Sequence, residues 1–108
     1  MKLNVVGFGA LNVDKLYRVR RIAREGEESF IESLKEFAGG SAANTIVGLA
    51  RLGLKTGYIG KVSNDPEGKF LLDDFKKDDV DIRGIILSKG GRSGVVMGFV
   101  DRKGERAL

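Results

Sequence analysis

Hydrophobic positions in the first forty residues form short runs and weak alternations rather than helical repeats. Residues 3–8 form an apolar run that ends in glycines, which predicts a buried strand of a parallel sheet. Residues 14–21 and 28–37 are half polar and alternate weakly, which is typical of strands in a sheet with one exposed face. We therefore expect three strands in this part of the chain.

The period changes at Ser41, where apolar residues begin to recur at helical spacing up to Gly53. Residues 64–67 (Asn-Asp-Pro-Glu) predict a second helix, since a capping side chain precedes a proline at the first helical position and an acid. Strand patterns at residues 55–62 and 85–87 flank this helix. The resulting order of strands and helices predicts an α/β fold with a parallel sheet flanked by helices.

The last fifteen or so residues have a different pattern. Residues 94–100 and the segment from Glu105 flank residues 101–104, which end in glycine and are typical of a hairpin turn. We therefore expect a hairpin here instead of a further helix.

Composition narrows the class of protein. A chain of 108 residues with 42% hydrophobic and 31% charged residues is typical of one soluble globular domain. No apolar run approaches the ~20 residues of a membrane span, and no signal peptide precedes the first strand, so we expect no membrane partner. The chain contains no Cys, which suits a cytoplasmic location, and no His, which excludes His-ligated metals and serine-protease-like triads within it.

Basic residues are concentrated between Asp14 and Glu25. The net charge is +4, and the cluster consists of Lys15, Arg18, Arg20, Arg21 and Arg24. Glutamates follow the basic cluster at once, and no aromatic residue other than Tyr17 accompanies the cluster. A solvated, salt-bridged face is therefore favoured over an anion-binding role. A nucleic-acid patch is the least favoured interpretation, and we expect no nucleic-acid partner.

Polar side chains that could bind a small molecule follow the first strand. Asn12 and Asp14 are two residues apart, so in an extended segment they point to the same side. A carboxylate accepts hydrogen bonds from hydroxyls and an amide both donates and accepts, which suits a polyol. The same spacing also fits an Asx turn that leaves the strand, and spacing alone does not separate the two interpretations.

A second candidate group lies where the first predicted helix begins. Gly39 and Gly40 allow the backbone to approach a ligand closely, and Asn44 lies in the first helical turn. The alternative is a plain glycine-rich turn before a helix that packs on the sheet. A dinucleotide fingerprint is disfavoured, because Asn12 stands where the third glycine would be, and no Gly-Lys-Ser/Thr phosphate loop occurs.

Taken in order, these motifs resemble the N-terminal signature of the ribokinase-like (PfkB) carbohydrate kinases. The resemblance is carried by residues 39–44 (Gly-Gly-Ser-Ala-Ala-Asn), the strand at 58–62 and residues 63–68 (Ser-Asn-Asp-Pro-Glu-Gly), and it spans essentially all of residues 1–108. It implies the N-terminal part of a ribokinase-like α/β domain, truncated before a C-terminal nucleotide-binding half. It also implies a small β lid built from about 14–37 and 93–108.

The function implied by the resemblance is ATP-dependent phosphoryl transfer to a sugar hydroxyl. It assigns sugar binding to five residues: Asn12, Asp14, Gly39, Gly40 and Asn44. ATP and Mg²⁺ are implied for a full-length protein. The Gly-Ala-Gly-Asp motif that provides the family's anion hole and catalytic base does not occur here. The resemblance therefore implies no catalytic or metal-binding residue in this chain, and no activity for the 108 residues alone.

Three further expectations follow from the resemblance and its departures. Ser41 stands where ribokinases carry Lys, which argues against ribose as substrate, while Ile46 and Ser63 depart from the signature in ways that affect local packing. Lids of this family often pair, which implies a possible homodimer through the lid. Two alternatives stay open: a non-catalytic polyol-binding or association module, and a nucleoside kinase with base-stacking residues Tyr17, Phe30 and Phe99.

Overall fold

The computed structural model describes residues 2–107, which divide into two compact units. The first, which we call the sheet–helix unit, consists of Met1–Val13 and Ala38–Gly94. The second, which we call the β unit, consists of Asp14–Phe37 and Val95–Leu108. The chain therefore passes from one unit to the other three times.

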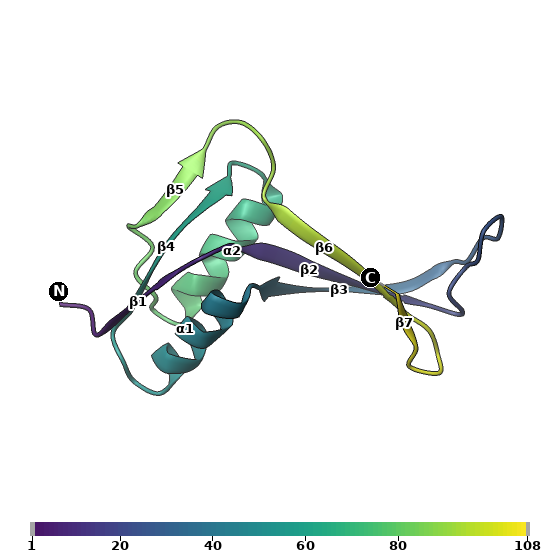
Figure 1. The fold of residues 1–108 in the computed structure, drawn as a ribbon, viewed down its shortest axis with the longest axis horizontal. Coiled ribbons are helices and arrows are strands. Elements are labelled where there is room, and N and C mark those ends of the chain that lie inside the picture. The colour runs from purple at the N-terminus through teal and green to yellow at the C-terminus, as the bar shows by residue number, and fades with distance from the viewer. Residues whose placement is uncertain (1, 108) are drawn as a thin grey trace. The chain divides into compact units, whose positions relative to one another are not determined.

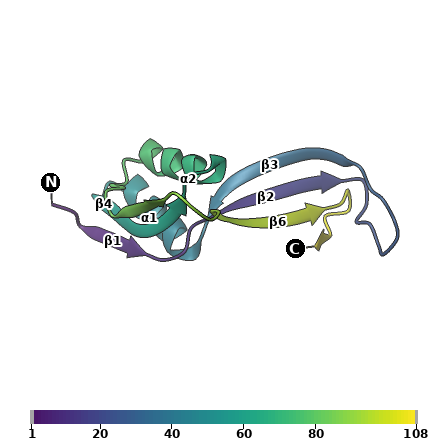
Figure 2. The same ribbon diagram turned by 90° about the horizontal axis from the view of Figure 1, so that it is seen from above.

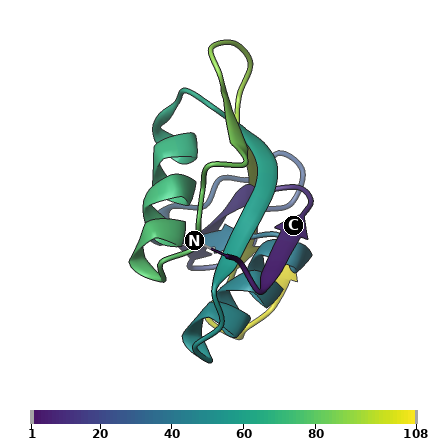
Figure 3. The same cartoon turned by 90° about the vertical axis from the view of Figure 1, so that its left-hand side faces the viewer.

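The sheet–helix unit contains a parallel sheet with the strand order β1-β4-β5. Its elements are β1 (Val5–Phe8), α1 (Ser41–Arg51), β4 (Thr56–Ser63), α2 (Pro66–Lys77) and β5 (Ile85–Ser88). Both helices lie on the same side of this sheet (Figures 1 and 3). The predicted alternation of strands and helices in a parallel sheet is confirmed.

A hydrophobic core lies between the two helices and the covered face of the sheet. Its buried members include Ile46 of α1, Tyr58 and Val62 of β4, and Leu71 and Phe75 of α2. The rings of Tyr58 and Phe75 lie 5.1 Å apart between centroids. Neither helix in residues 2–107 has the length and hydrophobicity that a membrane span requires.

The opposite face of the parallel sheet is uncovered in the described part of the chain. Side chains on this face include Val6 and Phe8, which are 49% and 78% exposed, and the exposed Ile59 and Ile86. The expectation that the first strand is buried is therefore wrong for this face. The reason is that a parallel strand is buried on both sides only where helices cover both, and α1 and α2 cover one.

The second sheet has the order β3-β2-β6-β7, and most of it belongs to the β unit (Figure 2). Its strands are β2 (Asn12–Val19), β3 (Ile31–Gly39), β6 (Gly94–Val100) and β7 (Arg106–Ala107). Strands β6 and β7 pair antiparallel, and the Gly104 N–H donates to the Asp101 carbonyl in the turn between them, 3.1 Å away. The predicted hairpin is confirmed.

One strand boundary changes the interpretation of the candidate site. Strand β2 begins at Asn12 rather than at residue 14, so Asn12 and Asp14 are both strand residues. The alternative of an Asx turn that leaves β1 is therefore wrong. The β unit takes in nearly the residue ranges assigned above to a lid, but its action as a lid and a homodimer through it stay predictions.

Candidate functional site

The candidate site in the sheet–helix unit lies where β1 ends and α1 begins. After Phe8 the chain turns through three residues to reach Asn12. Gly40, at the start of α1, lies against this turn, since a Cβ atom on Gly40 would be 2.5 Å from the Ala10 carbonyl oxygen. The two glycine-bearing motifs of the sequence are therefore in backbone contact at the carboxyl end of β1.

The amino end of α1 is left without a side-chain cap. Gly40 is the N-cap residue, with φ 119° and ψ 129°, and it makes no side-chain cap hydrogen bond. The backbone N–H of Asn44 donates to the Gly40 carbonyl at 2.9 Å, and the Asn44 side chain is exposed. Uncapped N–H groups at a helix start suit an oxygen-rich ligand.

Asn12 lies two residues after the carbonyl that Gly40 approaches, and its Cβ is close to the beginning of β6. A Cβ atom on Gly94 would be 3.3 Å from the Asn12 Cβ, so only glycine lets β6 start this close to Asn12 without adjustment. Asp14 belongs to the β unit, two residues along β2 and on the same side of the strand as Asn12. Of the five predicted residues, the sheet–helix unit thus contains all but Asp14.

Tyr58 contributes to this arrangement and was not expected from the sequence. Its side chain is 1% exposed, and its hydroxyl donates to the Ala10 carbonyl oxygen at 3.4 Å. Burial raises the pKa of the Tyr58 phenol, so the hydroxyl keeps its proton and remains a donor. Tyr58 therefore helps to fix the carbonyl against which Gly40 packs. The sequence feature that could have indicated this role is a tyrosine within a predicted buried strand, because a buried tyrosine hydroxyl needs a hydrogen-bond partner.

A hydrogen-bonded cluster around Asp65 was also missed. The Asp65 carboxylate accepts hydrogen bonds from the backbone N–H of Gly68 at 2.7 Å, and from both the backbone N–H and the hydroxyl of Ser93 at 2.8 Å. Ser93 immediately precedes Gly94, the residue that packs on Asn12. Asp65 therefore ties the start of α2 to the segment beside Asn12. The sequence predicts the cap, but not a partner 28 residues away.

We expect Asp65 to make the stability of the protein depend on acid pH. The hydrogen bond from the Ser93 backbone N–H holds the pKa of the Asp65 carboxyl below its ordinary value, and the hydrogen bond from the Gly68 backbone N–H lowers it further. A carboxyl whose pKa is lower in the folded than in the unfolded state stabilises the fold. The full contribution is present at a pH above the unfolded-state pKa of about 4, and it is lost as the pH falls through the folded-state pKa. Asp65→Asn should therefore lower the free energy of unfolding at neutral pH and flatten its decline in acid.

Urea denaturation at a series of pH values measures this effect. Asp73→Asn is a matched control, because Asp73 lies on the same helix and its ion pair, with Lys69 at 3.4 Å, is exposed. If the free energy of unfolding declined equally steeply with acid pH in the two variants, the role given to Asp65 would be contradicted.

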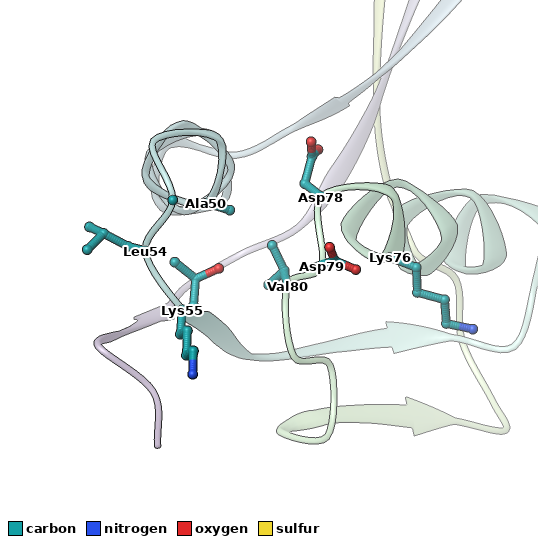
Figure 4. A pocket seen from close by; sticks show the side chains of 9 residues that line it. Ala50, Leu54, Lys55, Lys76, Asp78, Asp79 and Val80 are labelled. Atoms are coloured by element: carbon teal, nitrogen blue, oxygen red, sulfur yellow. The ribbon is translucent and has the colours of Figure 1, made fainter. Parts of the chain in front are cut away.

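A separate hollow of about 780 Å³ lies elsewhere in the sheet–helix unit (Figure 4). It is lined by the carboxyl-terminal ends of α1 and α2, by Leu54 and Lys55 before β4, and by Val80. None of the predicted site residues lines it. Because Thr56 is the first residue of β4, this hollow lies at the amino end of that strand. Ligands of open α/β sheets bind at the carboxyl ends, so we do not assign the site here.

The described residues contain no large cluster of metal-ligating side chains. Nowhere in residues 2–107 do three or more Asp, Glu, His or Cys side chains gather closely enough to hold an ion. No step is therefore assigned to a metal here.

Comparison of the sequence with protein-family models identifies the family of this chain. The family model described as pfkB family carbohydrate kinase matches residues 2–108. The chain belongs to the pfkB family of carbohydrate kinases. Among curated pfkB relatives, 5-dehydro-2-deoxygluconokinase of Clostridium perfringens is 40% identical over 92 residues, which are 85% of this chain and 26% of that enzyme. The chain thus spans about a quarter of the length of this relative.

Solved structures confirm the ribokinase-like fold of this pfkB chain. Ribokinase of Arabidopsis thaliana, solved with ribose and ATP, matches with a TM-score of 0.88 at 22% identity, over 99% of this chain and 35% of that one. The nucleoside kinase of Methanocaldococcus jannaschii matches with a TM-score of 0.82 at 23% identity, over 95% of this chain and 34% of that one. At these identities the likeness shows the fold alone, which sugar and nucleoside kinases share.

Proposed function

We propose that this chain supplies the acceptor-binding residues of an ATP-dependent kinase that phosphorylates a sugar hydroxyl. The observation that carries the proposal is the contact of Gly40 with the Ala10 carbonyl, because it sets the uncapped start of α1 beside the segment that leads to Asn12. Membership in the pfkB family supports the reaction class.

In this proposal each residue has a distinct task toward the sugar. Asp14 accepts hydrogen bonds from two hydroxyls, and the amides of Asn12 and Asn44 both donate and accept. Gly39 and Gly40 permit close approach of the backbone to the sugar ring. Asn12 and Asp14 are assigned to this task as residues two apart in one strand, β2.

We assign ATP and Mg²⁺ to parts of a longer protein. The chain spans about a quarter to a third of the proteins it matches. Its described residues offer no acidic cluster for a metal. In this proposal the 108 residues alone bind the acceptor and do not transfer phosphate.

The second candidate, a nucleoside kinase, is disfavoured by an observation within the β unit. The rings of Tyr17 and Phe99 stack on each other, with centroids 5.4 Å apart and an angle of 22° between planes. Tyr17 is three residues from Asp14 in β2, so its side chain lies on the opposite side of the strand. Two of the three aromatics proposed to stack on a base are thus paired with each other, away from Asp14.

Substrate profiling of a longer protein that contains this chain tests the proposal. Coupled assays with ATP would compare pentoses, hexoses, sugar acids and nucleosides as acceptors. We expect turnover of at least one sugar and none of the nucleosides. A kcat/KM for a nucleoside above that for every sugar would favour the nucleoside kinase. A folded protein without turnover of any acceptor would favour the non-catalytic module.

A further inference from the structure

The β unit contains a hollow of about 900 Å³ between the connection from β2 to β3 and the hairpin of β6 and β7. This volume is within the range of small-molecule clefts. The apolar residues among those that line it are Ile22 and Ala107. The wall is dominated instead by six cationic residues from both segments: Arg20, Arg21, Arg24, Arg102, Lys103 and Arg106.

Three carboxylates share this wall, and two of them are already occupied by local hydrogen bonds. Glu27 accepts a hydrogen bond from the Arg21 guanidinium at 2.6 Å and another from the Arg24 backbone N–H at 3.1 Å. Asp101 accepts from the backbone N–H groups of Lys103 and Glu105, each at 2.9 Å. Six cations and three carboxylates leave an excess of three positive charges around the hollow.

Salt bridges account for two of the six cations. Arg21 pairs with Glu27, and Arg102 pairs with Glu32, which does not line the hollow, both at 2.6 Å. Within residues 2–107, no carboxylate lies within ion-pair distance of the remaining four, which are Arg20, Arg24, Lys103 and Arg106. The salt-bridged face favoured by the sequence therefore explains only part of this cluster.

We propose that this hollow binds a small, multiply charged anion of the phosphate type. Planar guanidinium groups bind phosphate oxygens through two parallel hydrogen bonds. The two chain segments place such groups on both sides of one cavity, which suits an anion with several oxygens. Among residues 2–107, no aromatic side chain lines the hollow, so this part of the chain gives it no stacking platform of the kind found in single-stranded nucleic-acid sites.

The anion site is separate from the proposed acceptor site. None of the five acceptor-site residues lines the hollow, and Arg24 and Arg106 have no part in the acceptor site. Loss of sugar binding would therefore leave this proposal unaffected, and loss of anion binding would leave the acceptor site unaffected.

Titration of the 108-residue chain with pyrophosphate, followed by calorimetry and by amide NMR shifts, tests the proposal. We expect saturation at one equivalent, with the largest shifts at residues 20–24 and 101–106. The double variant Arg24→Gln, Arg106→Gln should weaken binding at least about tenfold, the scale of one lost charge-assisted hydrogen bond. A sugar bisphosphate titrated in parallel distinguishes a phosphate ester from an inorganic ligand.

The matched control removes the same two charges from the sheet–helix unit. Lys76→Gln, Lys77→Gln should leave pyrophosphate affinity within about twofold, because neither lysine lines the hollow. An equal loss in both double variants, or shifts that do not saturate, would overturn the proposal in favour of diffuse attraction. A DNA duplex that displaces pyrophosphate at lower concentration would overturn the small-anion assignment.

Discussion

In a longer kinase that contains this chain, Asp14→Ala is expected to weaken use of the acceptor sugar by about ten- to a hundredfold. The estimate follows from the loss of about 1.5–3 kcal/mol when a charged acceptor is removed from hydroxyl donors. KM for ATP should change little, because the proposal gives Asp14 no contact with the nucleotide. Steady-state kinetics with each substrate varied in turn measures both effects.

Two further variants make this result specific. Asp14→Asn keeps one acceptor oxygen and should fall between the wild type and Asp14→Ala. Glu28→Ala removes an exposed carboxylate from the same unit and should leave sugar use unchanged. If Asp14→Ala kept the wild-type kcat/KM for the sugar, Asp14 would be only a strand residue. An equal loss of ATP use would point to misfolding.

Gly40→Ala is expected to destabilise the protein by about 1–3 kcal/mol, the usual cost of an unfavourable backbone conformation. Two faults combine at this position. The φ of 119° is rarely adopted by residues with a side chain, and the new Cβ would lie 2.5 Å from the Ala10 carbonyl oxygen. Relief of that contact would move the start of α1 away from the segment leading to Asn12, so sugar binding should also weaken.

Gly48→Ala provides the control for Gly40→Ala in the same helix. Gly48 lies inside α1, and a Cβ there would meet nothing within 4 Å. Alanine should therefore stabilise the helix by about 0.5–1 kcal/mol. Urea denaturation of the two variants compares them directly. Changes of the same sign would contradict the special conformation assigned to Gly40.

The secondary structure could be predicted because its signals are local. The second helix begins where the sequence predicts it, since the Asp65 cap and Pro66 act within one turn. The first helix ends just before Gly53, whose φ of 97° is the left-handed conformation expected there. The approach of Gly40 to the turn after β1 could be anticipated only from the resemblance to a family.

Features that depend on distant partners could not be predicted. The Asp65–Ser93 hydrogen bonds and the contact of Tyr58 with Ala10 join segments that no local pattern connects. The exposure of Phe8 depends on which faces of the sheet the helices cover, and a strand's own sequence does not specify this. The pairing of Tyr17 with Phe99 depends on the order of strands in the second sheet.

The most direct test of the acceptor site is hydrogen–deuterium exchange of the longer protein with and without its acceptor sugar. The account predicts slower exchange in peptides that cover residues 10–14 and 39–44 when the sugar is bound. Nucleotide alone should not slow exchange there, and Asp14→Ala should reduce the effect at the same sugar concentration. Sugar-dependent protection confined to other parts of the protein, with these two segments unchanged, would contradict the account.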